Sequence, residues 1–206
     1  MTNICSNTPF FYTFIIMEKI FYSNINAAEN PYYIHHIKKT KFETDFRSFE
    51  KGILFYAEGG VLHIFGEEQH WYLPGRCYMW IPAGTKHRIV SHSLLINLHI
   101  LFFETETNED VFFKDVNIYL VNDLLREMLL FTQTWNGGIN ETQKAKFDFI
   151  KAIKSILPMI GNALNNFPIQ HPYPNDDRLI AIAQFLNQHI QTAYTLEEIA
   201  KKFGFS

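Results

Sequence analysis

The stretch VLHIFGEEQHWYLPGRCYMWIPAGTKHRIV, residues 61–90, has the pattern that decides the fold. Two apolar runs surround a Gly-Glu-Glu turn, and Pro-Gly and Pro-Ala-Gly turns lie on either side of a third run, CYMWI. Short runs rich in aromatic and β-branched residues, separated by Gly and Pro, are typical of antiparallel strands. This stretch therefore predicts successive strands joined by tight turns.

The same pattern continues on both sides. GILFYAEGG, residues 52–60, is an apolar run closed by a Gly-Gly turn, and LLINLHILFFE, residues 94–104, is a long and almost wholly apolar strand. Many strands at near-even spacing, without a helical stretch between them, predict an antiparallel sandwich or barrel.

Composition excludes several classes of protein. The 206 residues are 47% hydrophobic and 16% aromatic, which is typical of a folded globular chain. A formal net charge of -3 gives no broad basic field, so most of the chain is not a nucleic-acid surface. The two cysteines, Cys5 and Cys77, form no CxxC motif and indicate neither a disulfide framework nor a zinc cluster. We therefore expect a cytoplasmic protein.

The N-terminus carries an apolar segment, PFFYTFII, at residues 9–16. It has no basic flank and no cleavage site, and it is too short to span a bilayer. We expect a loosely attached strand, or residues upstream of a natural start at Met17, and no membrane partner.

The hydrophobic period changes after Glu104. Residues 116–135 (VNIYLVNDLLREMLLFTQTW) and 142–164 (TQKAKFDFIKAIKSILPMIGNAL) each have a broad apolar helical face, and Gly137-Gly138 lies between them. They predict an antiparallel helix pair, the second helix kinked at Pro158. The apolar surface exceeds what one barrel face needs, so self-association as a homodimer is expected; simple packing onto the barrel is the alternative. The predicted dimerisation residues are Val121, Leu125, Met128, Ile150, Ile153 and Leu157.

The C-terminal part begins after a proline-rich linker. An amphipathic helix is predicted in DDRLIAIAQFLNQHI, residues 176–190, and a second in TLEEIAKKFGFS, residues 195–206. Thr195 and Glu198 form a capping box, and Leu196, Ile199, Ala200 and Phe203 form one apolar face. Gly204 ends the helix, and Ser206 is a preferred N-cap for a following helix.

Residues 176–206 resemble the start of the DNA-binding domain of the AraC family of bacterial transcription regulators. The length between elements, the LEEIA core and the Gly-x-Ser turn match together. PGRCYMWIPAGTKHRI, residues 74–89, is similar to the second sequence motif of cupin barrels, the usual sensor domain of this family. An ordinary amphipathic helix pair is the alternative interpretation of the C-terminal part.

The resemblance implies a mostly β plus α fold: a cupin-like double-stranded β-helix (jelly-roll barrel), an antiparallel helix pair and a short helical C-terminal piece. The expected organisation is an N-terminal extension (1–17), a ligand-sensing barrel (18–110), a helical dimerisation segment (111–165), a linker (166–177) and a truncated helix-turn-helix domain (178–206).

Specific DNA binding is not expected of this chain alone. In helix-turn-helix proteins the second helix enters the major groove, and here that helix would begin after Ser206. The chain therefore carries the supporting helix, with Thr195, Glu198, Gly204 and Ser206, and DNA is a partner of the full-length protein only.

Metal chemistry is not expected either. Cupin metalloenzymes use a His-x-His pair and a Glu in the first motif and a further His in the second. His87 matches the second-motif His, but the Glu position falls on Gly52, and residues 45–48 (DFRS) offer no His. One imidazole does not hold a catalytic metal, and no Gly-x-Ser-x-Gly or P-loop motif occurs. We expect no metal, no cofactor and no enzymatic activity.

The barrel is instead expected to bind a small effector, a sugar or another small polar molecule. Strand alternation does not decide which side chains face inward, because the runs are apolar on both faces. His35, His36 and His70 are expected in or near turns, in water. The candidate ligand residues are Trp80, His87, Arg88, Tyr56, His63, His99 and Arg47.

The sequence thus predicts the effector-sensing and dimerisation region of an AraC-type regulator that lacks the recognition helix. The alternatives are a small cupin metalloenzyme with an unconventional metal site, and a naturally short chain that dimerises with a full-length relative and silences it.

Overall fold

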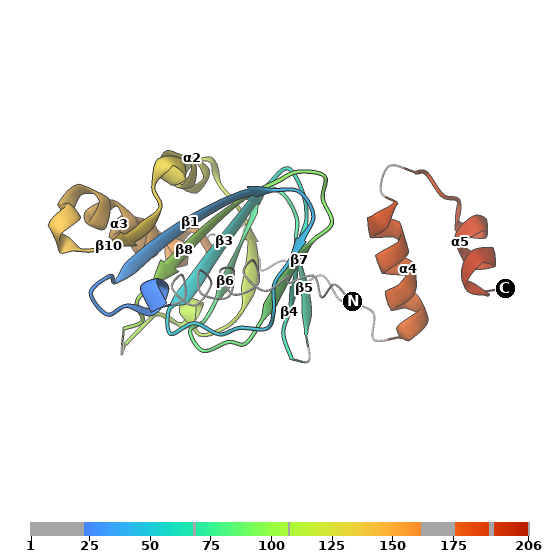
Figure 1. The fold of residues 1–206 in the computed structure, drawn as a ribbon, viewed down its shortest axis with the longest axis horizontal. Coiled ribbons are helices and arrows are strands. Elements are labelled where there is room, and N and C mark those ends of the chain that lie inside the picture. Colours follow the sequence, from blue (N-terminus) through green and yellow to red (C-terminus); the bar gives the residue numbers. More distant parts are fainter. Residues whose placement is uncertain (1–22, 68, 107, 162–175, 190–191, 206) are drawn as a thin grey trace, which may run out of the picture.

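The computed structural model describes residues 23–67, 69–106, 108–161, 176–189 and 192–205 (Figure 1). The predicted N-terminal extension, most of the predicted linker and Ser206 lie outside these residues. The described chain contains two antiparallel sheets, followed by helical segments. This confirms the predicted fold class.

The larger sheet has six strands, in the order β10-β1-β8-β3-β6-β9, and the smaller has four, in the order β2-β7-β4-β5. Neighbours such as β1 and β8 lie far apart in the sequence, as in a jelly roll. The six strands are β10 (Gly137–Ile139), β1 (Tyr32–Lys39), β8 (Ile96–Phe103), β3 (Gly52–Glu58), β6 (Cys77–Ile81) and β9 (Asn117–Leu120). The four are β2 (Phe42–Glu43), β7 (Arg88–Ser91), β4 (Leu62–Phe65) and β5 (His70–Leu73).

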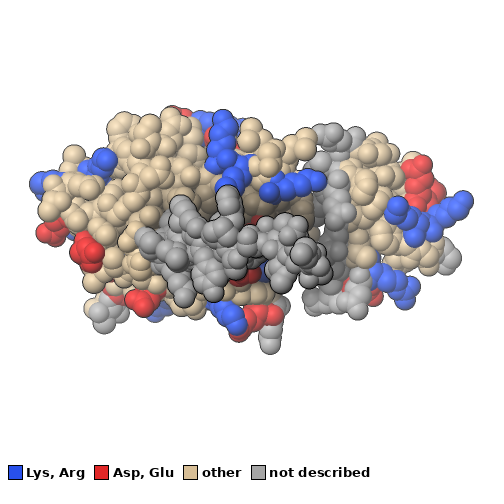
Figure 2. Space-filling model, viewed as in Figure 1, with Lys and Arg blue, Asp and Glu red and all other residues tan. Residues whose placement is uncertain are grey.

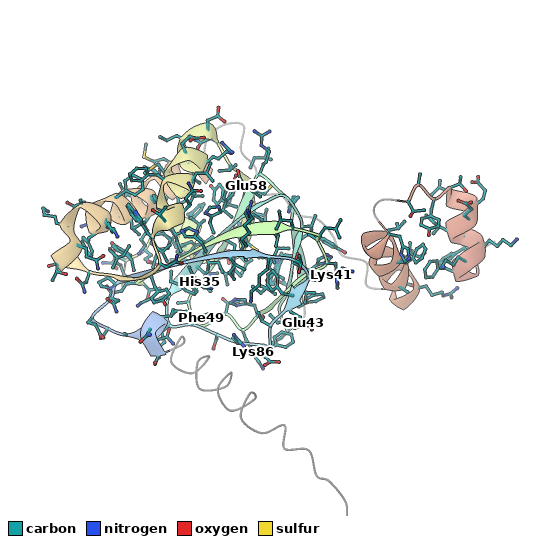
Figure 3. All side chains as sticks on the ribbon, turned by 45° about the horizontal axis from the view of Figure 1, so that its top comes forward. His35, Lys41, Glu43, Phe49, Glu58 and Lys86 are labelled. Atoms are coloured by element: carbon teal, nitrogen blue, oxygen red, sulfur yellow. The ribbon has the colours of Figure 1, made fainter. Side chains whose placement is uncertain are left out.

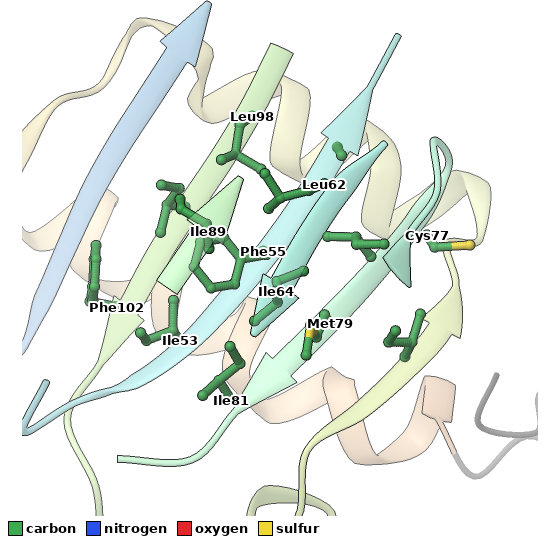
Figure 4. Close-up of a cluster of buried hydrophobic side chains, with 14 of the residues drawn as sticks. Ile53, Phe55, Leu62, Ile64, Cys77, Met79, Ile81, Ile89, Leu98 and Phe102 are labelled. Atoms are coloured by element: carbon green, nitrogen blue, oxygen red, sulfur yellow. The ribbon is translucent and has the colours of Figure 1, made fainter. Parts of the chain in front are cut away.

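The barrel interior is an apolar core between the two sheets (Figure 4). Side chains alternate between the two faces of a strand, so every second residue of each sheet enters this core. Figure 4 labels ten of its members: Ile53, Phe55, Leu62, Ile64, Cys77, Met79, Ile81, Ile89, Leu98 and Phe102.

A second apolar core covers the opposite face of the six-stranded sheet. Helix α2 (Asp123–Phe131), helix α3 (Lys144–Gly161) and the 3-10 helix η1 (Val111–Phe113) pack on this face. The Trp80 indole lies in this core and donates a hydrogen bond to the carbonyl of Phe113, at 3.0 Å. Burial on both faces explains why these strands are apolar at successive positions.

The helix predicted over residues 116–135 is shorter than expected. Residues 117–120 pair with β6 as the edge strand β9, and Ile118 enters the barrel interior. The helix begins at Asp123, because the Asn122 side chain accepts a hydrogen bond from the amide of Leu125 and caps it. Gly137-Gly138, predicted as a turn, forms part of β10 and pairs with β1.

The predicted dimerisation residues also need correction. Leu125, Ile150, Ile153 and Leu157 are fully buried in the second core of the same chain, which is the packing alternative. In this arrangement they are unavailable to a second copy. Val121 and Met128 are partly buried against the same core.

The C-terminal part consists of helices α4 (Asp177–Gln188) and α5 (Leu196–Phe203). The capping box of Thr195 and Glu198 is present, and Gly204 ends α5 in the left-handed conformation, with φ of 72°. The Phe185 ring of α4 contacts the Phe203 ring of α5, with 5.6 Å between centroids. Leu196 was expected on the apolar face, but its side chain is 82% exposed.

Figure 2 shows the charged residues of one face in small groups of both signs among uncharged surface. Such a distribution fits the small net charge. None of the helices in the described ranges combines the length and the apolarity that crossing a bilayer requires.

We predict that Gly52→Ala destabilises the barrel, because an added Cβ would lie 2.3 Å from the Trp80 ring. Overpacking of this kind costs about 1–3 kcal/mol of unfolding free energy. Gly75→Ala is the control, since its Cβ would meet only ordinary contacts, the nearest at 3.6 Å. Urea titration of both variants measures the effect, and equal stabilities would contradict this account of Gly52.

Candidate functional site

The seven predicted ligand residues do not form one site. Tyr56, Trp80 and His99 lie on the helix-covered face of the six-stranded sheet. His63 and Arg88 lie on the outer face of the four-stranded sheet, because their neighbours Ile64 and Ile89 enter the barrel interior. His87 contacts the interior core, and Arg47 pairs with it through the backbone.

The His87 imidazole is enclosed by aromatic rings. Its ring centroid lies 6.1 Å from that of Phe49 and 6.0 Å from that of Phe55, and its Nδ1 lies 2.8 Å from the carbonyl oxygen of Thr85. Burial lowers the pKa of His87. Among the described residues, no three His, Cys, Asp or Glu side chains lie together as metal ligands. The residues around His87 therefore do not fit the metal of a cupin enzyme.

A pair of histidines lies on the outer face of the four-stranded sheet. His63 Nδ1 is 3.2 Å from His70 Nε2, and the His70 ring stacks on Phe65 at 3.9 Å between centroids. The Arg88 guanidinium lies over the Phe65 ring, 4.4 Å from its centroid, and Arg88 pairs with Glu43. Burial, with neighbouring positive charge, lowers the pKa of His63 to about 4 and that of His70 to about 3. His70 was wrongly expected to be in water at a turn.

Five polar or aromatic side chains form a row across the helix-covered face of the six-stranded sheet. Cross-strand pairing places His36 beside His99, Tyr56 on the other side of His99, Tyr78 beside Tyr56, and Tyr119 beside Tyr78. The row crosses β1, β8, β3, β6 and β9 in order. We call these five residues the polar row.

Three of the four neighbouring pairs of rings in the polar row are in contact. Ring centroids are 4.7 Å apart for His36 and His99, 5.6 Å for His99 and Tyr56, and 5.3 Å for Tyr78 and Tyr119. Four of the five side chains are buried, and His36 is half-buried. The row is therefore a polar stripe inside an otherwise apolar core.

Helix α2 is connected to the polar row by polar contacts at two places, Arg126 in its first turn and Thr132 directly after its last residue. The Tyr56 hydroxyl donates to Glu58 Oε1 at 2.7 Å, and the same oxygen accepts from Arg126 Nε of α2 at 3.0 Å. Glu58 lies at the end of β3 close to α2 (Figure 3). Thr132, directly after α2, offers its carbonyl oxygen to His36 Nε2 at 2.7 Å. Polar contacts thus connect both ends of this helix to one row of the sheet.

Three buried atoms of the row have no hydrogen-bond partner within the described part of the chain. They are His36 Nδ1, His99 Nδ1 and the Tyr78 hydroxyl. His36 Nε2 faces a carbonyl oxygen and must carry the proton, which leaves Nδ1 as an acceptor in the neutral ring. Each buried polar atom without a partner costs about 1–3 kcal/mol. The row therefore contains three buried polar atoms whose hydrogen bonds the described part of the chain does not supply.

Burial keeps the row uncharged at neutral pH. It lowers the pKa of His99 to about 4, assisted by repulsion from His36, and it also lowers the pKa of His36. Burial raises the pKa of Tyr56 and of Tyr78. Burial alone would raise the pKa of Glu58, but hydrogen bonds from Tyr56 and Arg126 outweigh it and lower that pKa. The adjacent Glu58–Arg126 ion pair therefore remains charged and mutually compensated.

Sequence reasoning identified Tyr56 and His99 but missed His36, Tyr78 and Tyr119. It placed His36 in water near a turn, whereas the residue lies in β1. Only the register of four strand pairs brings these residues together, and a single sequence does not give that register.

No protein-family model matches the chain, and no curated protein matches its sequence. Solved structures resemble it. ToxT from Vibrio cholerae is 12% identical, with 85% of this chain and 72% of that chain covered and a TM-score of 0.42. ToxT from Vibrio cholerae strain SCE256, solved with an unsaturated fatty acid bound, is 11% identical over 88% of this chain and 71% of that chain, with a TM-score of 0.43. A cupin superfamily protein from Desulfitobacterium hafniense DCB-2 is 14% identical over 38% of this chain and 72% of that chain, with a TM-score of 0.35.

We predict opposite outcomes for two matched tyrosine variants. Tyr56→Phe removes a hydrogen bond to a carboxylate and should cost about 1–3 kcal/mol of unfolding free energy. Tyr78→Phe removes a hydroxyl without a partner in the described residues and should change stability by less than about 0.5 kcal/mol, or increase it. Chemical denaturation distinguishes them. A large loss in Tyr78→Phe would reveal a partner for that hydroxyl and contradict the description of the row.

We also predict that stability falls with acidification between pH 6.5 and about 4. The folded-state pKa of His99, about 4, lies below its ordinary value of 6.5. The unfolded chain therefore binds more protons in this range, and the stabilisation present above pH 6.5 is lost as pH falls. The His99 contribution is on the order of 3 kcal/mol. Unfolding free energies measured across this range should show a smaller decrease in His99→Phe, and an unchanged pH dependence would contradict the assignment.

Proposed function

We propose that this chain is the effector-sensing and dimerisation region of an AraC-type transcription regulator. The observation that carries the proposal is the α4–α5 unit. Its second helix starts at the capping box of Thr195 and Glu198 and ends at a left-handed Gly204, as the supporting helix of a helix-turn-helix would. A jelly-roll domain precedes this unit, in the order that the family resemblance implies.

The mechanism follows from the position of the helices on the barrel. An effector that binds one arrangement of the barrel and helices better than another shifts the population toward it. Helices α2 and α3 come between the barrel and the C-terminal unit in the chain. Their rearrangement would change how two DNA-binding domains are held, and dimer geometry sets which half-site spacing is bound.

The proposed homodimer uses helix residues other than those first predicted. Leu124 and Phe131 of α2 are 60% and 63% exposed, and Met159 of α3 is 74% exposed. They lie on the same two helices as the buried residues, on the sides turned away from the sheet. Exposed apolar side chains of this size support a contact with a second copy.

Leu124→Asp should weaken self-association at least about tenfold, because it places a charge in the proposed contact. Leu196→Asp is the control, a still more exposed leucine outside α2 and α3. Sedimentation equilibrium measures both. A dissociation constant of tens of micromolar corresponds to a binding free energy of about -6 kcal/mol. If the wild-type protein is still monomeric at that concentration, the proposed dimer is wrong.

Regulation of transcription is tested with the complete gene product. We expect a protein in which a recognition helix follows α5 to protect two half-sites about one helical turn apart in a footprinting experiment. The 206-residue chain should protect neither. A complete protein that protects no specific site would contradict the regulator proposal.

We further propose that the chain is not an enzyme. The small metalloenzyme alternative requires a metal at a defined ratio. Elemental analysis of the purified protein separates the two functions: stoichiometric iron, manganese or nickel would favour the enzyme.

A further inference from the structure

We propose that the polar row beneath α2 is the effector site and that it takes a small neutral molecule with several hydroxyl groups. This inference builds on the proposed function and locates its ligand on the helix-covered face of the sheet, outside the barrel interior.

The hydrogen-bonding groups of the row define what the ligand must offer. His36 Nδ1 is an acceptor, His99 Nδ1 is a second site on an uncharged imidazole, and the Tyr78 hydroxyl both donates and accepts. All three are withdrawn from water and lack partners within the described residues. A hydroxyl group can donate to an imidazole nitrogen and accept from a phenol, so several hydroxyls on one molecule complement the row.

The spacing of the groups favours more than one hydroxyl. His36 and His99 lie on adjacent strands, and Tyr78 lies two strands beyond His99. Adjacent strands are about 4.7–4.9 Å apart. A molecule with a single hydroxyl cannot reach all three positions, whereas a chain or ring bearing several can extend along the row.

Electrostatics favour a neutral ligand. The charged side chains that hydrogen-bond beside the row are Glu58 on β3 and Arg126 on α2, and they are already paired, with 2.9 Å between Arg126 Nη2 and Glu58 Oε1. Asp115 acts on Tyr119 at the far end of the row, and its negative charge also disfavours an anion there. A carboxylate would compete with Glu58 for Arg126, and an ammonium group would compete with Arg126 for Glu58. A neutral molecule leaves this ion pair intact.

The row has a buried end and an end near water. His36 is half-buried, and the Glu58 and Arg126 side chains are 24% and 30% exposed. Tyr78 is fully buried. A ligand would therefore enter between β1, β3 and α2, and the polar contacts of α2 lie at this entrance.

This location connects binding to helix α2. His36 Nε2 donates to the carbonyl oxygen of Thr132, and Arg126 donates to the carboxylate of Glu58, which also accepts from Tyr56. A ligand that bonds with the row changes these contacts directly. Helix α2 is therefore the element expected to shift when the effector binds.

The test uses xylitol and D-glucose as neutral probes, with acetate and ethylammonium as charged ones. Binding is followed through the imidazole proton resonances of the nine histidines in the complete 206-residue protein. We expect the neutral probes to shift the His36 and His99 resonances saturably, and the charged probes to leave them unchanged. Hydrogen exchange of the α2 amides should change in the presence of the bound probe.

Variants then locate the site. His99→Phe and Tyr78→Phe should each weaken binding of the neutral probe at least tenfold, and Tyr78→Phe is expected to fold normally. His63→Phe, in the histidine pair of the other sheet, is the control and should bind as the wild type does.

Two outcomes would overturn the inference. If the neutral probe binds but only His87→Phe abolishes binding, the ligand occupies the barrel interior, and the regulator proposal stands. If neither neutral probe binds the wild-type protein, the row holds ordered water only, and the ligand class is wrong. The footprinting experiment decides the regulator proposal separately in both cases.

Discussion

The six-stranded sheet is buried on both faces, and this constraint determines most of the structure. An antiparallel sheet commonly turns one face to water. Here the smaller sheet covers one face, and η1, α2 and α3 cover the other. Because successive strand residues point to opposite faces, apolar residues at successive positions fill both cores. The same constraint withdraws any polar side chain on these strands from water, so each needs a partner inside the protein. Tyr56 has one in Glu58, whereas Tyr78 has none in the described part of the chain.

Apolar packing and polar contacts have different roles in holding α2. Leu125 and Leu129 are fully buried, and burying a leucine contributes about 1.5–3 kcal/mol. A hydrogen bond contributes a net of about 0.5–1.5 kcal/mol, because water offers a similar bond to the unfolded chain. Apolar contacts therefore keep α2 on the sheet, but they are not directional. The contacts of its ends with Glu58 and His36 are directional and select one position of the helix. Changing them can shift the helix without unfolding it.

The sequence predicted what depends on local chemistry. The turn residues predicted where the strands of residues 61–90 begin and end, and the capping box predicted where α5 begins. It failed where short segments fit two patterns: Ile118 and Leu125 share a helical period, yet Ile118 lies in a strand that pairs with β6. The apolar faces of the helices were predicted, but burial of Ile150 and Ile153 against the sheet was only the alternative to self-association. The site could be predicted only in part, because its residues come together through the register of strands distant in sequence.

The two possible effector positions differ in how they can influence the helices. The barrel interior is surrounded by apolar side chains of two hydrogen-bonded sheets, so a change there must pass through the backbone of the six-stranded sheet. Packed cores of this kind do not deform continuously. The polar row is connected to α2 through Glu58, which accepts from both Tyr56 and Arg126, and to the residue after α2 through His36 and Thr132; these contacts are few and directional. Coupling between sites requires an element whose equilibrium both sites bias. Helix α2 lies against the sheet through Leu125 and Leu129 and exposes Leu124 and Phe131, so in the proposed function it is the element that both the proposed effector and the proposed second copy would contact.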